Sequence, residues 1–321
     1  MMLGHGSWTR FLGVLLYFLL FLFVIQLVNY HLKTSRDFVS SSTQGTEPVS
    51  DIEMIQPFLN YGGLYHMSHS YKVVSCSIGK CMSQLMLNIM CFLYNETLFE
   101  NNDQTMWDTW KDTRPCLDNV EFYSTKLIDW NTYQPVVFIR DPLDRFASFY
   151  VDKCINENVC FKCSKSDIRC VVKRLHRTLT RITQNATLPR KAHYMAEHAA
   201  PLSWYCMFNQ YFSKYSIIKV GTSIHDRGQA LLKLIDSIQH RGIPDKVVKR
   251  IFTESMFGET RHETHTSNDR LKVDRIIESD SYVRDYLHKI YFYDYLVFNF
   301  SRDPLDLEYK LSSLQLPGGS L

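Results

Sequence analysis

The 321-residue sequence has no internal repeat, no low-complexity tract within residues 61–321 and little net charge, with 36 Lys and Arg against 33 Asp and Glu. Hydrophobic residues make up 45% of the chain and charged residues only 21%, which excludes intrinsic disorder, a collagen-like repeat and a coiled coil as the main architecture. The part of the chain after residue 60 is long enough to bury the core of one folded domain.

One segment is far more apolar than the rest, because residues 11–28 form a nearly unbroken hydrophobic run. At about 1.5 Å per residue, this run spans about 27 Å as a helix, close to the thickness of a bilayer core. It is too long for the apolar region of a signal peptide, and no small-x-small pair follows it before His31. The run therefore predicts an uncleaved signal anchor rather than a cleaved signal peptide.

The flanking charges do not fix the direction of the anchor, because a single arginine precedes it and two basic residues follow it closely. All nine cysteines and three N-glycosylation sequons lie C-terminal to it, as expected in an oxidising lumen. The sequons begin at Asn95, Asn185 and Asn299. These features predict a type II membrane protein with a cytosolic tail (1–10), a transmembrane anchor (11–28), a stem (29–60) and a luminal domain (61–321).

Within the luminal domain, three short apolar strands are each followed by a loop and an amphipathic helix. Strands are predicted at 71–76, 135–139 and 216–221, and helices at 83–94, 143–154 and 226–240. Pro142 suits the first turn of the second helix, with Asp141 as its cap. This alternation predicts an α/β fold whose central, largely parallel sheet is flanked by helices.

Two of the strand-to-loop junctions carry a cation. In parallel sheets ligands bind beyond the carboxyl ends of the strands, where helix N-termini attract anions. Lys80 follows Gly79 at the first junction, and Arg140 ends the second strand, with Ser148 eight residues later. The upstream glycine and the following Ser or Thr of a Walker loop are missing, so a P-loop NTPase is excluded. A strand, a lysine and a helix start still form an anion cradle.

The stretch 138–148, FIRDPLDRFAS, closely resembles the 3′-phosphate-binding motif of sulfotransferases, and residues 76–83, CSIGKCMS, resemble their 5′-phosphosulfate loop. Together with the anchor and the segments 198–206 and 291–295, the pattern is similar to Golgi carbohydrate sulfotransferases. The nearest variety is the chondroitin-sulfotransferase-like group expanded in nematodes. One position departs from the family pattern, because Gln84 stands where the loop usually has a hydroxyl residue. Either Ser83 substitutes for it together with helix N–H groups, or the 5′ site is weakened.

The resemblance implies a sulfotransferase-like (P-loop-kinase-like) fold in the Golgi lumen. It also implies transfer of a sulfuryl group from 3′-phosphoadenosine-5′-phosphosulfate (PAPS) to a hydroxyl of a carbohydrate, expected to be a chondroitin-like glycosaminoglycan. Arg140 and Ser148 are then expected to bind the 3′-phosphate. Arg145 is expected either to add a second cation there or to be a surface ion-pair partner.

Lys80 and Ser83 are expected to bind the 5′ group, and Lys80 to neutralise the oxygen that leaves with the bisphosphate. No metal is expected, because lysine and N–H donors already hold the leaving group. Two alternatives stay open. One is a luminal glycan kinase, which would need Mg²⁺, and the other is a non-catalytic, membrane-anchored glycan-binding paralogue.

A general base must accept the proton of the sugar hydroxyl. No histidine lies between Cys81 and Arg140, where some relatives place theirs. His198 is the leading histidine, with a purely structural role as its alternative. The other options are the carboxylates Glu96, Glu100 and Asp103 and, with less support, His193 and His265.

Basic charge is concentrated between residues 162 and 191, where nine Lys and Arg accompany a single Asp. Lys173, Arg177 and Arg181 recur every four residues on one face of a predicted amphipathic helix. This ridge is expected to bind an acidic polysaccharide, a merely solvated face being the alternative. Nucleic acid is not expected as a partner, because the lumen lacks it and the chain has no nucleic-acid-binding motif.

The cysteines favour disulfides. Four of them lie close together before and at the start of the basic helix: Cys154, Cys160, Cys163 and Cys170. Zinc is the alternative, but no histidine completes a familiar finger and the lumen is oxidising. Because nine is an odd number, at least one thiol stays unpaired within the chain. Buried free thiols are expected among Cys76, Cys81 and Cys91.

Overall fold

The computed structural model describes residues 53–108, 116, 121–122, 124–258 and 267–301. The chain divides into two compact units, residues 1–51 and 52–321, and every described residue belongs to the second. The predicted cytosolic tail, the predicted anchor at 11–28 and most of the predicted stem lie outside the described residues. Among the helices that the structure describes, none is long and apolar enough to cross a membrane.

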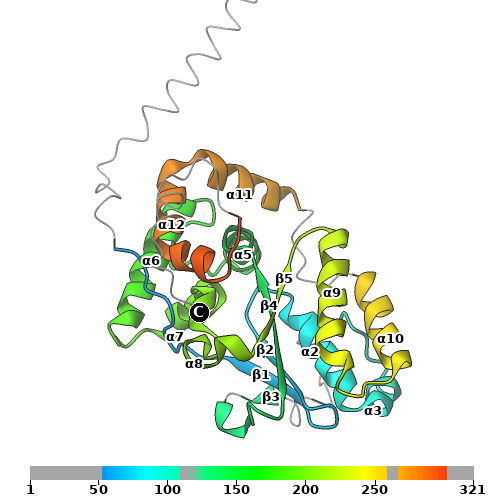
Figure 1. Cartoon of the computed structure of the whole chain (residues 1–321). Helices are drawn as coiled ribbons and strands as arrows, with labels where there is room; N and C mark the ends of the chain where they lie inside the picture. Colours follow the sequence, from blue (N-terminus) through cyan, green and yellow to red (C-terminus); the bar gives the residue numbers. More distant parts are fainter. Residues whose placement is uncertain (1–52, 109–115, 117–120, 123, 259–266, 302–321) are drawn as a thin grey trace, which may run out of the picture. The chain divides into compact units, whose positions relative to one another are not determined.

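A mixed sheet with the strand order β3-β1-β2-β4-β5 lies at the centre of the second unit (Figure 1). Its strands are β1 (Leu64–Ser68), β2 (Val73–Ser77), β3 (Glu121–Phe122), β4 (Gln134–Arg140) and β5 (Ser216–Val220). β2, β4 and β5 run parallel, whereas β1 is antiparallel to both β2 and β3. The predicted α/β fold is confirmed, but the sheet is parallel only over the three strands that the sequence predicts.

The antiparallel half of the sheet escapes prediction for local reasons. β1 and β2 form a hairpin through a turn at residues 69–72, in which Lys72 has a φ of 53°. That turn contains neither glycine nor asparagine, the residues that usually announce a hairpin. β3 is only two residues long, too short for a hydrophobic period to appear.

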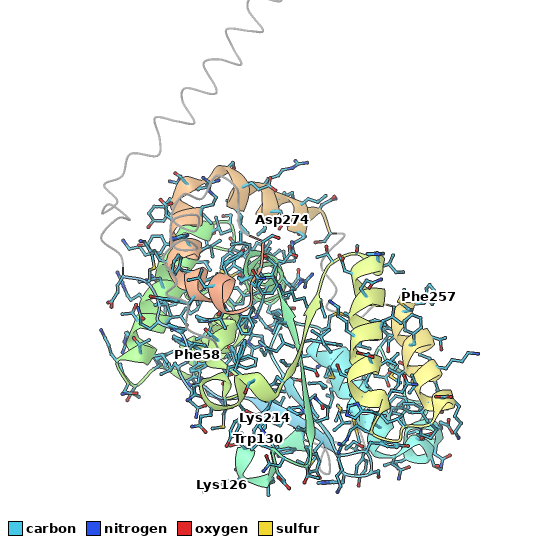
Figure 2. All side chains as sticks on the ribbon, viewed as in Figure 1. Phe58, Lys126, Trp130, Lys214, Phe257 and Asp274 are labelled. Carbon is cyan, nitrogen blue, oxygen red and sulfur yellow. A yellow bond between two sulfur atoms is a disulfide. The ribbon has the colours of Figure 1, made fainter. Side chains whose placement is uncertain are left out.

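Helices pack on both sides of the sheet, with α2, α9 and α10 on one side and α5, α6, α7 and α12 on the other (Figure 1). Their bounds are α2 (Ser83–Tyr94), α3 (Glu96–Asn101), α5 (Pro142–Phe149), α6 (Ile168–Thr183), α7 (Arg190–Ala199), α8 (Phe208–Tyr211), α9 (Ile224–Gln239), α10 (Asp245–Met256), α11 (Asn268–Ser279) and α12 (Ser281–Val297). Side chains fill the space between these layers (Figure 2). The core strand β4 is buried over Val136–Ile139, as a parallel strand covered on both faces should be.

The predicted helices compare closely with those observed. α2 has the predicted bounds, and α9 begins two residues early because Ser223 and Asp226 form a capping box at its start. α5 begins as predicted, since Asp141 accepts the backbone N–H groups of Leu143 and Asp144 and Pro142 occupies the first turn. The predicted continuation to residue 154 changes form, because Tyr150–Asn156 is a π-helix.

Residues 53–60, predicted to belong to the stem, contact the rest of the folded unit. Ile55 is buried and its backbone N–H donates to the carbonyl oxygen of Lys289, 2.9 Å away. The indole N–H of Trp204 donates to the carbonyl oxygen of Gln56 at 2.7 Å. The folded unit therefore begins before residue 61.

Of the four disulfides among the described residues, two join cysteines 130 and 25 residues apart in the sequence, and two join cysteines only 6 and 7 residues apart. The pairs are Cys76–Cys206, Cys91–Cys116, Cys154–Cys160 and Cys163–Cys170. The preference for disulfides over zinc in the 154–170 cluster is therefore confirmed. The expectation of free thiols is wrong for Cys76 and Cys91, whose partners lie far away in the sequence, and right for Cys81, which is buried and free.

Candidate active site

A cavity of about 810 Å³ opens where β2, β4 and β5 end. Its lining includes Lys80 after β2, Arg140 at the end of β4, and Gly221 and Thr222 after β5. β2 and β4 are adjacent and parallel, with Cys76 opposite Val137, so their carboxyl ends lie side by side. The two cationic junctions predicted from the sequence therefore meet in one cavity.

The loop after β2 forms one wall of this cavity. Lys80 and Met82 adopt left-handed conformations, with φ of 68° and 56°, which are uncommon for residues other than glycine and concentrate at functional sites. Met82 provides no side-chain cap for α2, whose first residue, Ser83, lines the cavity together with Gln84. The first N–H groups of α2 are thus left to other acceptors, an arrangement that favours an anion.

Lys80 lies in a network of charges. Its ammonium group donates to Asp152 at 3.0 Å, and its side chain is only 10% exposed. Burial lowers the pKa of Lys80, while the carboxylate of Asp152 counteracts that shift. Asp152 also pairs with Lys153 at 3.0 Å, and Lys153 in turn pairs with Glu157 at 2.6 Å. Burial alone would raise the pKa of Asp152, but the two ammonium groups outweigh burial and lower it to about 2.

The π-helix at Tyr150–Asn156 brings Asp152 and Lys153 into this network. Sequence reasoning missed both residues, because they belong to no motif and the helix pattern there predicts ordinary α-helical turns. The segment is held by the Cys154–Cys160 disulfide and by the hydroxyl of Tyr150, which donates to the carbonyl oxygen of Lys165. π-Helical turns are frequent at functional sites, because they redirect side chains that an α-helix would space evenly. The sequence offers one signal for them: Asp152 and Lys153 follow Ser148 by four and five residues on the same helical segment.

Arg140 and Ser148, the two residues expected to bind the 3′-phosphate, both line the cavity. Arg140 ends β4, and its guanidinium reaches the carbonyl oxygen of Lys80 at 3.5 Å, which ties the two junctions together. Ser148 lies two turns into α5 and is 4% exposed. An arginine and a hydroxyl group can bind one phosphate, the arginine through two parallel N–H groups.

Arg145 does not have either of the expected roles. It lies outside the cavity lining and is fully buried, so it is not a surface ion-pair partner. Its guanidinium donates to the carbonyl oxygens of Gly79 at 2.9 Å and Ala200 at 2.6 Å. Its place behind the loop also contradicts the expectation of a second cation at the 3′-phosphate. Arg145 instead holds the loop after β2 against the segment that follows α7.

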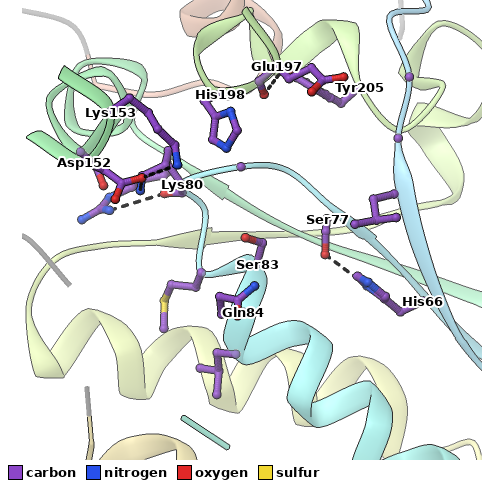
Figure 3. A pocket seen from close by; sticks show the side chains of 18 of the residues that line it. His66, Ser77, Lys80, Ser83, Gln84, Asp152, Lys153, Glu197, His198 and Tyr205 are labelled. Carbon is purple, nitrogen blue, oxygen red and sulfur yellow. Dashed lines mark hydrogen bonds and ion pairs between the residues drawn. The ribbon is translucent and has the colours of Figure 1, made fainter. Parts of the chain in front are cut away.

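His198 points toward the loop after β2, and Figure 3 shows it gathered there with Lys80 and Ser83. Its Nδ1 lies 2.8 Å from the carbonyl oxygen of Tyr194, so Nδ1 carries the proton and Nε2 is left as an acceptor. Burial, and after it the positive charges of Lys153 and Lys80, lower the pKa of His198 to about 4. The imidazole is therefore neutral at neutral pH, the form that a general base requires.

The other bases considered from the sequence lie elsewhere. Glu96 and Glu100 belong to α3 and contact α10, where Glu100 pairs with Arg250 and Glu96 lies 4.0 Å from Lys246. Glu96, Glu100 and Asp103 all lie outside the cavity lining. His193 stacks on Tyr61 at 5.2 Å, outside the lining, and His265 lies outside the described residues.

The segments 198–206 and 291–295, both part of the family resemblance, lie against each other. The hydroxyl of Tyr291 donates to the carbonyl oxygen of Ala199, and Asp294 accepts the backbone N–H groups of Leu202 and Ser203. Burial raises the pKa of Asp294 to about 6, against the lowering effect of these N–H groups. α12 thereby fixes the segment after His198, which the Cys76–Cys206 disulfide also joins to β2.

Sequence reasoning also missed several residues that line the cavity. They are Tyr61, His66, Trp107, Glu157, Tyr194, Glu197, Tyr205 and Arg227. His66 comes from β1, a strand that was not predicted, and its Nδ1 lies 3.2 Å from the hydroxyl oxygen of Ser77. Trp107 precedes a segment outside the described residues, and its indole N–H donates to the carbonyl oxygen of Glu254. These residues come together only when the strands and helices assemble, and no local sequence pattern predicts it.

The basic ridge lies on α6, outside the cavity lining. The helix is amphipathic as predicted, with Val171, Val172, Leu175 and Leu179 buried. Arg177 and Arg181 are exposed and Lys173 is half-buried. α6 packs against α7, the helix that carries His198.

The three sequon asparagines are all exposed: Asn95, Asn185 and Asn299. Asn95 caps α3, its side-chain oxygen accepting the N–H of Leu98, which leaves the amide nitrogen for a glycan.

Comparison with known proteins agrees with this geometry. Residues 64–301 match the model of the Sulfotransferase family, so the chain belongs to that family. It is similar to carbohydrate sulfotransferase chst-1 of Caenorhabditis elegans, with 29% identity over 288 residues, covering 86% of this chain and 85% of that protein. It is also similar to putative sulfotransferase vep-2 of the same nematode, with 26% identity over 222 residues, covering 64% and 66%. No solved structure matches. The sulfotransferase resemblance inferred from the sequence is confirmed.

Proposed function

We propose that this protein transfers a sulfuryl group from PAPS to a hydroxyl of a carbohydrate. The observation that carries the proposal is that Lys80, Arg140 and Ser148 meet in one cavity at the carboxyl ends of adjacent parallel strands. The printed name of chst-1 supports a carbohydrate as the acceptor.

The chemistry of the lining fits this donor. PAPS carries anionic groups on both its 3′ and 5′ sides, and the cavity offers cations and N–H groups at two separate junctions. Arg140 and Ser148 would hold the 3′-phosphate. Lys80, Ser83 and the first N–H groups of α2 would hold the 5′ phosphosulfate, a role that compensates for glutamine at position 84.

The transfer breaks the sulfur–oxygen bond to the 5′-phosphate and forms a sulfur–oxygen bond to the sugar, giving a sulfate ester and the 3′,5′-bisphosphate. The sugar hydroxyl loses its proton to Nε2 of His198. The negative charge that grows on the departing oxygen is met by the Lys80 ammonium group. As in phosphoryl transfer, placement and fixed positive charge supply most of the acceleration.

We propose a chondroitin-like glycosaminoglycan as the acceptor and the ridge on α6 as its binding surface. Arg177 and Arg181 are exposed on α6, which packs against α7, the helix that carries His198. We also propose that the domain lies in the Golgi lumen and is anchored in the membrane through residues 11–28. Four disulfides and three exposed sequons support that location.

The test incubates the full chain in detergent with sulfur-labelled PAPS or phosphorus-labelled ATP and a panel of acidic and neutral glycans. Label from PAPS should enter an acidic glycan, and a chelator should leave the rate unchanged. Label entering only from ATP, and only with Mg²⁺, would indicate a glycan kinase. Glycan binding without transfer from either donor would indicate a binding protein.

A further inference from the structure

Asp152 lies at the centre of the charge network on the cavity wall. One of its oxygens, Oδ2, is 3.0 Å from the Nζ of Lys80 and 3.0 Å from the Nζ of Lys153. Its side chain is 5% exposed, so these contacts are made away from bulk water. Two ammonium groups therefore share one buried carboxylate.

The two lysines depend on that carboxylate to different degrees. Lys153 has a second acidic partner in Glu157, at 2.6 Å, and lies over the ring of Tyr194. The ammonium group of Lys80 pairs with Asp152, while its remaining charged neighbours are cations, Lys153 and Arg140. Removing the Asp152 charge thus leaves Lys80 buried among like charges, which penalises its protonated form.

We propose that Asp152 is a positioning residue for sulfuryl transfer, which fixes the Lys80 ammonium group, in its charged form, where the loop after β2 meets the π-helix. The inference rests on the proposed function, because it presupposes that Lys80 meets the departing oxygen. A charge that is already in place before the donor binds needs no reorganisation during the reaction, and such preorganisation is a major source of catalysis. The other groups that face Lys80 are His198 from α7, Arg140 from β4 and Lys153 from the π-helix.

The proposal is tested first without donor or acceptor. The full chain is labelled with acetic anhydride, which acetylates a lysine only in its unprotonated form, across a series of pH values, and mass spectrometry follows Lys80. In Asp152→Asn, the pH at half-maximal labelling should fall by at least one unit, a tenfold change in the protonation equilibrium. In Lys153→Met, the midpoint should rise instead, because a neighbouring cation is removed.

The matched control is Asp144→Asn, eight residues earlier on α5. Asp144 accepts from buried Arg270 at 2.6 Å but lies outside the cavity lining, so its loss should leave the Lys80 midpoint unchanged. An unchanged midpoint in Asp152→Asn overturns the proposal, as does an equal shift in Asp144→Asn. If Asp152→Asn does not fold, Lys153→Met decides: an unchanged or lowered midpoint contradicts the proposed network.

A second measurement tests whether the Asp152–Lys80 pair affects the rate of transfer. In the transfer assay, the alkaline limb of the kcat profile should move to lower pH in Asp152→Asn by the same amount as the labelling midpoint, and Asp152→Glu should restore it. A shifted midpoint without a shifted limb overturns the positioning role. If no form of the protein uses PAPS, the proposed function fails, while the labelling result still decides the Asp152–Lys80 pairing.

Discussion

Arg140→Ala tests the 3′-phosphate site most directly. Arg140 lies at the end of β4 and lines the cavity, and its contact with the carbonyl oxygen of Lys80 is long, at 3.5 Å. Because Arg140 is half-buried rather than part of the core, we expect the variant to fold. Losing a charged hydrogen bond to a partly buried phosphate costs about 3 kcal/mol. Because about 1.4 kcal/mol is a tenfold change, the Kd of the bisphosphate should rise about a hundredfold.

Calorimetry with 3′-phosphoadenosine-5′-phosphate measures that affinity without requiring turnover. Arg241→Ala is the matched control, because Arg241 donates to the carbonyl oxygens of Tyr71 and Thr132, just before β2 and β4 begin. It truncates an arginine at the opposite end of the same two strands and should leave the affinity unchanged. Unaltered affinity in a folded Arg140→Ala variant, or an equal loss in Arg241→Ala, would refute the assignment.

Three further predictions concern catalysis and the acceptor. Lys80→Met should lower kcat by several orders of magnitude in the PAPS assay, and a rate within tenfold of the wild type would exclude Lys80 as the group that meets the departing oxygen. His198→Gln should lower kcat about 10²- to 10⁴-fold with unchanged bisphosphate affinity. In the wild type the rate should fall as the pH drops through about 4, because Nε2 then takes up a proton, and persistence of that acid limb in His198→Gln would assign it to another group. Reversing Lys173, Arg177 and Arg181 to glutamate should raise the KM for an acidic glycan and flatten its salt dependence, since screening limits these charges to about 8 Å at physiological salt. The control reverses three exposed lysines of α9 and α10: Lys233, Lys246 and Lys249. Equal effects of the two reversals would show that the ridge is a solvated face and not the glycan-binding surface.

The second junction could be predicted almost completely, because its information is local. A β-branched run forms β4, Asp141 caps the next helix through its own side chain, and Pro142 is compatible only with the first turn. Arg140 ends the strand and Ser148 lies two turns into the helix that follows, so their placement relative to each other is also set locally. Both residues consequently line the cavity where they were expected.

Arg145 shows the limit of such reasoning. It belongs to the same motif, and one helical period separates it from neighbours that line the cavity, yet it is fully buried behind the loop. Its partners are the carbonyl oxygens of Gly79 and Ala200, about 60 residues away on either side. No local pattern shows that those two carbonyls will come together.

The sequence was sufficient for features set within about ten residues: the three parallel strands, α2, the capped start of α5, the apolar face of α6 and the family motif. Those features depend on side-chain period, caps and backbone preference, which act between near neighbours. The tertiary structure decided the antiparallel edge at β1, the Cys76–Cys206 pairing, and the meeting of Lys80 with Asp152 and His198. Those contacts join residues that are distant in the chain, and they form only when strand order and the burial of apolar surface bring the segments together.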